Sequence, residues 1–326
     1  MKLLIVGSLA YDSIKTEQNS VEHTLGGSAI YAGISAAKHL NNISKDIVNN
    51  VGIVGVIGTD FLKSDLDRLT KQGLNIKGIE KEDGLTFRWS GSYSGDMSQA
   101  ITHSTDLNVF ETFLPKVPED FKTPEITFCA NMHPLIQSSV LDQTKPHKFA
   151  AVDSMNLWIN NTPDELSMIL RRVEMAILNS DEVKMLADCE NLIEAGNLIR
   201  TGKVLDGGEN EGSGPNILII KKGGDGVLAL FNESIIELPA FPTSKIIDPT
   251  GCGDSFAGAL LAHLSIKSKI DENILTNALI HANVTASFTI EEMGVIGIEN
   301  LSNNKDDLYD IGNKHYVSTH KIKGLL

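Results

Sequence analysis

Short apolar runs alternate with amphipathic segments along most of the chain. A short apolar run bounded by turn residues is typical of a buried strand, whereas apolar positions that recur every three to four residues indicate a helix. Buried strands are predicted at residues 2–6, 51–57, 126–130, 148–152, 175–178 and 217–220. Helices are predicted at residues 28–40 and 61–72. Because strands and helices alternate, the pattern predicts an α/β fold with a mostly parallel sheet flanked by helices.

One stretch has a different period. Apolar and polar residues alternate from Leu85 to Tyr93, which is typical of a strand with one buried face. Gly91 interrupts the apolar face and indicates a β-bulge. The Gly- and Glu-rich segment 207–215 is predicted to be an exposed loop.

The most informative motif lies where the end of a predicted strand meets a helix. It reads Asp248-Pro249-Thr250-Gly251-Cys252-Gly253-Asp254-Ser255-Phe256, and the following apolar residues share one helical face. A glycine turn at a helix N-terminus offers free amides and the positive end of the helix dipole, which together form an anion site. A carboxylate beside an anion site suggests a base or a metal ligand, so Asp254 indicates phosphoryl transfer to a hydroxyl. The structural alternative is a glycine turn that caps the helix, with Asp254 interacting with the dipole.

This pattern, Asp-x-Thr-Gly-x-Gly-Asp, resembles the C-terminal signature of the ribokinase-like, or pfkB, family of carbohydrate and nucleoside kinases. The family usually has Ala between the two glycines, and this chain has Cys252, which is also small. The resemblance implies that Asp254 is the base and that the amides of Gly251, Cys252 and Gly253 stabilise charge on the transferred group. It also implies ATP, Mg²⁺ and a monovalent cation such as K⁺ near Asp248.

The family layout covers nearly the whole chain and consists of a large α/β domain with a small β lid. The resemblance places the lid at residues 13–25 and 85–113, and the α/β domain at residues 1–12, 26–84 and 114–326. It also suggests a homodimer formed through the lid. Trp89 and Tyr93 would then face the substrate or the partner's lid, unless they are ordinary lid core.

Four residues near the N-terminus are candidates for binding the acceptor. Gly26 and Gly27 resemble the family's diglycine, which lets the backbone approach the substrate and acts as a lid hinge; a simple turn is the alternative. Asp12 matches a sugar-binding aspartate of the family, or else forms a turn. Tyr31 stands where the family often has a sugar-binding asparagine, and this departure leaves the substrate open.

Asn179 and Glu182 follow the predicted strand 175–178 with the spacing of the family's Asn-x-x-Glu motif. That motif is associated with magnesium and phosphate, so the resemblance implies that Glu182 holds Mg²⁺ through water. A capping box, with Asn at the N-cap and Glu at the third helical position, explains the same spacing without a ligand.

The remaining candidates for nucleotide binding are Gly223, Gly226 and Asn283. The glycines lie between two apolar segments, where a hairpin turn explains them equally well. Asn283 lies in the helix that lines the adenine pocket in family members. The roles of Asp153 and Asn156, which follow the strand 148–152, are left open.

Two histidines, His263 and His281, are predicted to lie on helix surfaces and to take no part in catalysis. The tail beyond Leu301 is polar, and Tyr309 and Tyr316 are its candidates to pack back onto the body of the protein.

Composition narrows the class of protein. A chain of 326 residues with 41% hydrophobic content suits one large α/β domain with an appendage, or two domains. Its net charge of −14 argues against nucleic acid or an anionic membrane as a partner, although amides and magnesium can still hold ATP. Three widely spaced cysteines, no apolar run of membrane length and no signal-peptide pattern at the start predict a reduced, cytoplasmic protein.

Together these features predict an ATP-dependent kinase whose acceptor is a small sugar or polyol. A nucleoside kinase of the same fold is the close alternative, in which Tyr31 stacks on a base. A non-catalytic binding protein is less favoured because Asp254 and the glycines are present. An NAD oxidoreductase is poorly supported, because Gly7 is not part of a G-x-G-x-x-G turn.

Overall fold

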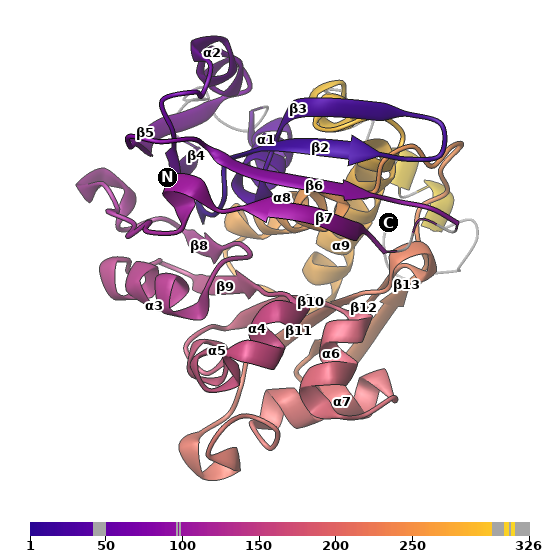
Figure 1. Cartoon of the computed structure of the whole chain (residues 1–326). Helices are drawn as coiled ribbons and strands as arrows, with labels where there is room; N and C mark the ends of the chain where they lie inside the picture. Colours follow the sequence, from indigo (N-terminus) through magenta and orange to yellow (C-terminus); the bar gives the residue numbers. More distant parts are fainter. Residues whose placement is uncertain (42–49, 96, 98, 302–309, 313, 317–326) are drawn as a thin grey trace.

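The computed structural model describes residues 1–41, 50–95, 97, 99–301, 310–312 and 314–316 (Figure 1). Within this part of the chain a large sheet is flanked by helices, and a smaller sheet lies to one side of it. None of the helices described is long and apolar enough to cross a membrane.

The described part of the large sheet has nine strands. Their order across the sheet is β13 (Ser234–Leu238), β12 (Val227–Phe231), β11 (Ile217–Lys221), β10 (Met175–Asn179), β9 (Phe149–Asp153), β8 (Ile126–Cys129), β1 (Leu3–Val6), β4 (Val51–Ile57) and β5 (Leu74–Lys81). Only β12 pairs antiparallel with its neighbours, and the other pairs are parallel. The prediction of a mostly parallel sheet is confirmed, with strand ends shifted by one residue in several cases.

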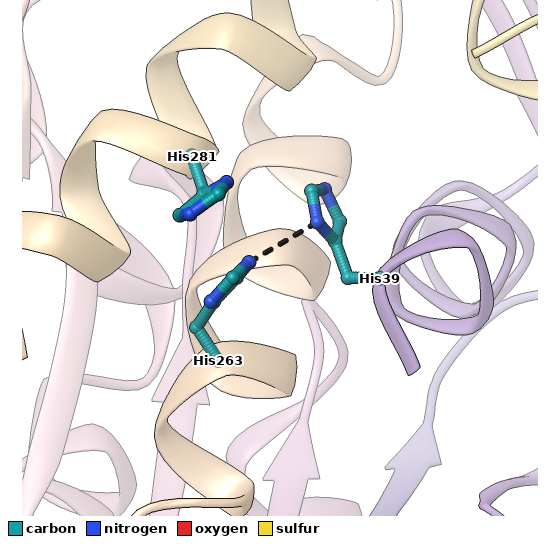
Figure 2. A group of neighbouring side chains, drawn as sticks. All are labelled: His39, His263 and His281. Carbon is teal, nitrogen blue, oxygen red and sulfur yellow. Dashed lines mark hydrogen bonds between the residues drawn. The ribbon is translucent and has the colours of Figure 1, made fainter. Parts of the chain in front are cut away.

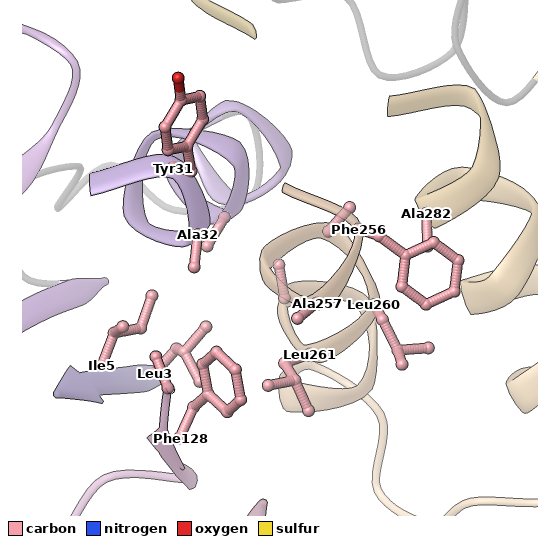
Figure 3. Packing of buried hydrophobic residues seen from close by; sticks show 14 of the residues in the cluster. Leu3, Ile5, Tyr31, Ala32, Phe128, Phe256, Ala257, Leu260, Leu261 and Ala282 are labelled. Carbon is pink, nitrogen blue, oxygen red and sulfur yellow. The ribbon is translucent and has the colours of Figure 1, made fainter. Parts of the chain in front are cut away.

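Helices cover both faces of this sheet. One core cluster combines alternate strand residues such as Leu3 and Ile5 with α1 (Ser28–Leu40), α8 (Cys252–Ser265) and α9 (Glu272–Ile290), as Figure 3 shows. The other cluster takes the intervening strand residues and packs them on helices of the opposite face: α3 (Pro134–Gln143), α5 (Pro163–Leu170), α6 (Ser180–Ala187) and α7 (Leu192–Thr201). Burial on both faces explains why the strands are continuous apolar runs rather than alternating ones.

The smaller sheet has the order β3 (Ser20–Gly26), β2 (Ala10–Lys15), β6 (Phe87–Ser92) and β7 (Ile101–Asp106). Its strands come from two chain segments, and β2 pairs parallel with β6 while both outer pairs are antiparallel. The bulge predicted at Gly91 is confirmed by a register shift between Ser90 and Gly91 in the β6–β7 pair.

The remaining elements correct some boundaries. Helix α2 (Lys63–Lys71) starts two residues after the predicted Phe61. Segment 207–215 is not wholly an exposed loop, because it contains a 3₁₀ turn and ends in two buried residues. The short helices that complete the fold are α4 (Asn156–Asn161) and α10 (Ile296–Glu299).

The C-terminal tail is described in part. Tyr316 packs back as predicted, with its side chain fully buried, and its hydroxyl donates to Pro239 O over 2.8 Å. The prediction for Tyr309 lies outside the described residues.

Candidate active site

The glycine-rich motif forms the turn and helix start that the sequence predicts. The amides of Ile247 and Asp248 donate to Ile290 O, which fixes the segment before the turn. Gly251 is the N-cap of α8 with a φ of 73°, a left-handed conformation that glycine adopts without strain. Asp254 therefore lies in the first helical turn, beside amides that have no partner within a helix.

Burial and a neighbouring carboxylate make Asp254 less acidic than an ordinary aspartate. Burial is the main cause and Asp153 adds to it, while Lys221 acts in the opposite direction, and together they raise the pKa of Asp254 to about 7. A carboxyl group with a pKa near neutrality is suited to general base catalysis, because it is both ionised and basic at working pH.

Asp12 faces the same place from the smaller sheet. Its side chain is 4% exposed and packs on Gly26, where an added Cβ would lie 2.0 Å from Asp12 Oδ2. Burial, followed by the charges of Asp248 and Asp254, raises the pKa of Asp12 to about 7, although the Gly27 amide donates to its carboxylate. Asp12 therefore packs against the backbone of the diglycine. Gly27 tolerates no side chain, because its φ is 98° and an added Cβ would lie 2.5 Å from Ser8 O.

Tyr31 lies between these groups and is almost fully buried, with 1% of its surface exposed. Its ring packs against Gly251, where an added Cβ would lie 2.2 Å from a ring carbon. The buried hydroxyl has no hydrogen-bond partner among the residues that the structure describes. Burial, followed by Asp12, raises the pKa of Tyr31 well above its usual value, so the hydroxyl is a donor. An unsatisfied buried hydroxyl is unfavourable unless a ligand pairs with it.

Asp248 is fully buried and acts through the backbone. Its two carboxylate oxygens accept from Thr250 N over 2.9 Å and from Gly294 N over 2.8 Å. Burial raises the pKa of Asp248 even so. Asp248 therefore connects the glycine turn to the loop after α9.

Tyr93, which directly follows β6 of the smaller sheet, also contacts the signature. This side chain is buried, and its hydroxyl accepts from Thr250 Oγ1 over 3.2 Å. Of the two aromatic residues considered from the sequence, Tyr93 is thus in contact with the signature. Trp89 instead bonds within its own sheet, donating from Nε1 to Thr102 Oγ1.

A second group of charged residues lies where β9, β10 and β11 end, and the sequence analysis did not predict that they would lie together. Asp153, Glu182 and Lys221 gather there, and Lys221 Nζ lies 3.0 Å from Asp153 Oδ2. Burial and Asp153 raise the pKa of Glu182 to about 7. Each of these residues lies at the carboxyl end of a parallel strand or just after it. The carboxyl ends of parallel strands meet at one edge of the sheet, and this is the one signal in the sequence that relates the three residues.

The capping box that the sequence offered as the alternative to a magnesium site is present at Asn179. Asn179 Oδ1 accepts from Glu182 N over 2.8 Å, and Glu182 accepts from the backbone and side-chain nitrogens of Asn179, both over 2.7 Å. The same four-residue pattern recurs at Asn191 and Glu194, at the start of α7. The Asn-x-x-Glu spacing therefore indicates a helix N-cap and does not by itself indicate a metal site. Glu182 differs from the exposed Glu194 because Glu182 is buried beside Asp153.

The three nucleotide candidates have different surroundings. Gly226, with a φ of 93°, abuts Leu238 O and is required by the hairpin, whereas Gly223 is exposed and has open space around it. Asn283 is a buried residue that donates to Pro239 O and to the Tyr316 hydroxyl, which gives it a structural role. Asn156 is exposed at the start of α4.

The expectation that His263 and His281 lie on helix surfaces is wrong. Both are buried and meet His39 between α1, α8 and α9 (Figure 2). His263 Nε2 and His39 Nδ1 are hydrogen-bonded over 3.2 Å, and His39 Nε2 pairs with Thr285 Oγ1 over 2.8 Å. His263 stands within a run of apolar residues in α8, which was the available sign of burial.

This histidine cluster has the composition of a metal site, because ring nitrogens of all three residues lie within 4.8 Å of one another. However, the rings of His263 and His281 stack with centroids 3.7 Å apart and planes 15° apart. Imidazole lone pairs lie in the ring plane, so those of two nearly parallel rings do not converge on one ion. We interpret the cluster as a hydrogen-bonded contact between three helices.

Comparison with known proteins tests the resemblance that was inferred from the signature. Residues 2–301 match the family model described as pfkB family carbohydrate kinase. The chain belongs to the pfkB family. The resemblance inferred from the signature is thereby confirmed, and pfkB kinases are phosphotransferases that act on hydroxyl groups.

Known proteins are similar to this pfkB family member over most of its length. It is 27% identical over 279 residues to the cytidine kinase of Thermococcus kodakarensis, covering 83% of this chain and 91% of the relative. The crystal structure of the Methanocaldococcus jannaschii nucleoside kinase superposes with a TM-score of 0.72 at 19% identity, covering 97% and 99% of the two chains. A probable sugar kinase from Rhizobium etli superposes with a TM-score of 0.75 at 16% identity, covering 95% and 98%. These structures show that the pfkB protein has the ribokinase fold.

Proposed function

We propose that this protein is an ATP-dependent nucleoside kinase that transfers the γ-phosphoryl group to a hydroxymethyl oxygen, with Asp254 as the base. The observation that carries the proposal is the grouping of Asp254, the glycine turn at the N-terminus of α8, and Asp12 in one place. In the reaction the acceptor oxygen bonds to the γ-phosphorus, the bond to the β-phosphate bridging oxygen breaks, and the hydroxyl proton passes to Asp254.

The roles at the anion site follow from helix geometry. The amides of Gly251, Cys252 and Gly253 belong to the turn and the first residues of α8, where an N-terminus favours anions. The amides of Gly251 and Gly253 would stabilise the charge on the transferred group. The Cys252 amide donates to Pro249 O over 3.1 Å, so its role at the phosphate stays a prediction. Gly223, which has open space beside it, is the candidate for approaching the nucleotide, while Gly226 supports the turn. A role for Asn283 at adenine stays a prediction.

The acceptor would be held by Asp12 and Tyr31, with Gly26 and Gly27 supporting Asp12. A carboxylate accepts hydrogen bonds from two vicinal hydroxyls, and the unpaired Tyr31 hydroxyl supplies a donor. Since Tyr31 is buried with its ring against Gly251, its ring does not offer a face for stacking on a base, contrary to the role suggested for it with a nucleoside. The small sheet, which carries Asp12 and is followed directly after β6 by Tyr93, is the proposed lid, and dimerisation through that lid stays a prediction.

The choice of a nucleoside rests on the relatives. The sequence favoured a sugar or polyol, and the sugar ring of a nucleoside presents the same hydroxyl groups to Asp12. The cytidine kinase covers 83% of this chain, and the nucleoside kinase of M. jannaschii covers 90% at 24% identity. These names support a nucleoside, while the probable sugar kinase bears on the fold only.

A substrate panel tests the proposal directly. ADP release would be measured with nucleosides, ribose, other sugars and polyols as acceptors. We expect the best nucleoside to have a kcat/KM at least about tenfold above that of ribose, because a pocket that binds the base discriminates against an acceptor without one. If sugars or polyols turn over and nucleosides do not, the nucleoside proposal is wrong and the sugar or polyol acceptor replaces it.

The residues around Glu182 fit a magnesium site in which water is an intermediary. Mg²⁺ takes oxygen ligands and keeps several waters, and both oxygens of Glu182 already accept from Asn179. Bound Mg²⁺ would neutralise phosphate charge. Burial and neighbouring negative charge raise the pKa values of Glu182 and Asp254, and a cation bound between these carboxylates would be stabilised by the same negative charge. A K⁺ site at Asp248 stays a prediction, since each oxygen of that carboxylate already accepts from an amide.

Glu182→Gln separates the magnesium role from capping. We expect the Mg²⁺ concentration for half-maximal rate to rise, because the carboxylate charge is lost. Gln still accepts from the Asn179 amide, so the melting temperature should move by no more than about 4 °C. Glu194→Gln, at the same helical position of α7, is the matched control and should leave the magnesium titration unchanged. An unchanged titration in Glu182→Gln would leave capping as the only role of this residue.

A further inference from the structure

Lys221 is a largely buried lysine that no role described so far requires. It is the last residue of β11, in register with Asn179 of β10. Its side chain is 17% exposed, and that of its partner Asp153 is 6% exposed. Burying a charged side chain is costly unless the charge is paired, so a lysine here needs a specific reason.

The surroundings of Lys221 keep it positively charged. Burial alone would lower its pKa, but the carboxylates of Asp153, Glu182 and Asp254 outweigh that effect, and the net result is a raised pKa. Lys221 is therefore a permanent ammonium ion rather than a base. Its positive charge lowers the pKa values of both Glu182 and Asp254, which burial and neighbouring carboxylates raise.

Gly253 places this ammonium group beside the anion site. A Cβ added at Gly253 would lie 3.1 Å from Lys221 Nζ, with the next two side-chain carbons at 3.8 Å. The ammonium group thus lies against the backbone of the first turn of α8. A glycine at this position leaves room for the lysine, and the lysine adds a full charge to the partial charge of the helix dipole.

We propose that Lys221 binds an oxygen of the transferred phosphoryl group, from the sheet side of the site, and that Asp153 positions it. An ammonium group has three donors, and the structure assigns one of them to Asp153 Oδ2. A phosphate entering a site with three carboxylates would otherwise meet only negative side-chain charge from that edge of the sheet. This inference rests on the proposed kinase function, and it gives Asp153, whose role the sequence left open, a positioning role.

The test compares Lys221→Met with wild type in the full chain. Methionine keeps the length and apolar stem but removes the charge. We expect the affinity for MgATP, measured by calorimetry, to fall about 10- to 100-fold, which is the range for one lost charged hydrogen bond. The affinity for MgADP, which has no γ-phosphoryl group, should change much less. The acid limb of the kcat/KM profile should also move to higher pH, since Lys221 lowers the pKa of Asp254.

Lys148→Met is the matched control. Lys148 is also largely buried and ion-paired, with Glu125, but it precedes β9 and so lies at the opposite end of that strand from Asp153. Its replacement should leave the preference for ATP over ADP and the pH profile unchanged. Lys221→Arg, which keeps the charge, should retain more of the ATP preference than Lys221→Met.

Two outcomes would overturn the inference. One is a Lys221→Met protein that keeps the wild-type preference for MgATP over MgADP and an unshifted pH profile. The other is an equal loss of affinity for both nucleotides, which would indicate a structural role. Failure of the kinase proposal itself would be distinct, because the wild-type protein would then release no ADP with any acceptor of the panel.

Discussion

Asp254→Asn is expected to lower kcat by about 10²- to 10⁴-fold while ATP binding is retained. Loss of a general base typically has a cost of this size, and asparagine matches the size of aspartate without accepting a proton. The first-turn backbone of α8 does not depend on the carboxylate, because Gly251 caps the helix without a side-chain bond. The measurement is kcat on the best acceptor of the panel, with nucleotide affinity measured in parallel.

Stability provides an internal check that Asp254→Asn is folded. The pKa of Asp254 is about 7 in the folded protein and near 3.8 when unperturbed, so between these values the folded state binds the proton more tightly. Stability from this group is therefore lost as the pH rises through that window. Asparagine does not ionise, so the variant does not lose this stability as the pH rises. At pH 8 its melting temperature should be no lower than that of the wild type.

The wild-type rate should fall as the pH drops below about 7, because the base becomes protonated. Asp164→Asn, an exposed first-turn aspartate of α5, is the control and should keep normal turnover. Near-normal turnover in a folded Asp254→Asn protein would show that another group is the base.

Gly251→Ala is expected to lower kcat/KM by about 10²-fold or more. The new Cβ would lie 2.2 to 2.4 Å from three ring atoms of Tyr31, and Tyr31 is 1% exposed and has no room to move away. The left-handed backbone adds about 1–2 kcal/mol of strain for a residue with a side chain. The turn must shift to relieve the contact, and a shift of about 1 Å at reacting groups costs roughly 10²-fold in rate.

A second glycine separates the contact from the strain. Gly208 also has a positive φ, 63°, but an added Cβ there meets no atom within 4 Å. Gly208→Ala should therefore show the backbone cost in its melting temperature and keep its activity. If Gly251→Ala retained the activity of Gly208→Ala, the turn would not be as rigid as its packing on Tyr31 implies.

Local pattern was sufficient for the strands and for the signature. Buried parallel strands are apolar on both faces, so the apolar runs at β4 and β11 predicted these strands with boundaries that differ by at most one residue. The turn followed by a helix was also predictable from the signature, because a tight glycine turn depends on adjacent residues only, and the structure starts α8 at Cys252.

Side chains that act across the fold were harder to predict. Lys221 and Asp153 are 68 residues apart, and each alone is an ordinary strand-end residue. The same holds for His39, which meets His263 and His281 only because α1, α8 and α9 pack together. Burial of these polar groups depends on which helices and strands are neighbours, and periodicity within one element carries no such information.

By itself the sequence determined the fold class, the family and the residues at the glycine turn, because these depend on local backbone chemistry and on apolar periodicity. Only the tertiary structure decided what surrounds those residues. It buried Tyr31 against Gly251, set Asp12 on Gly26 near Asp248 and Asp254, and gathered Asp153, Glu182 and Lys221 at the ends of three parallel strands. The physical reason is that carboxyl pKa values and hydrogen-bond satisfaction depend on burial and on charges brought close in space.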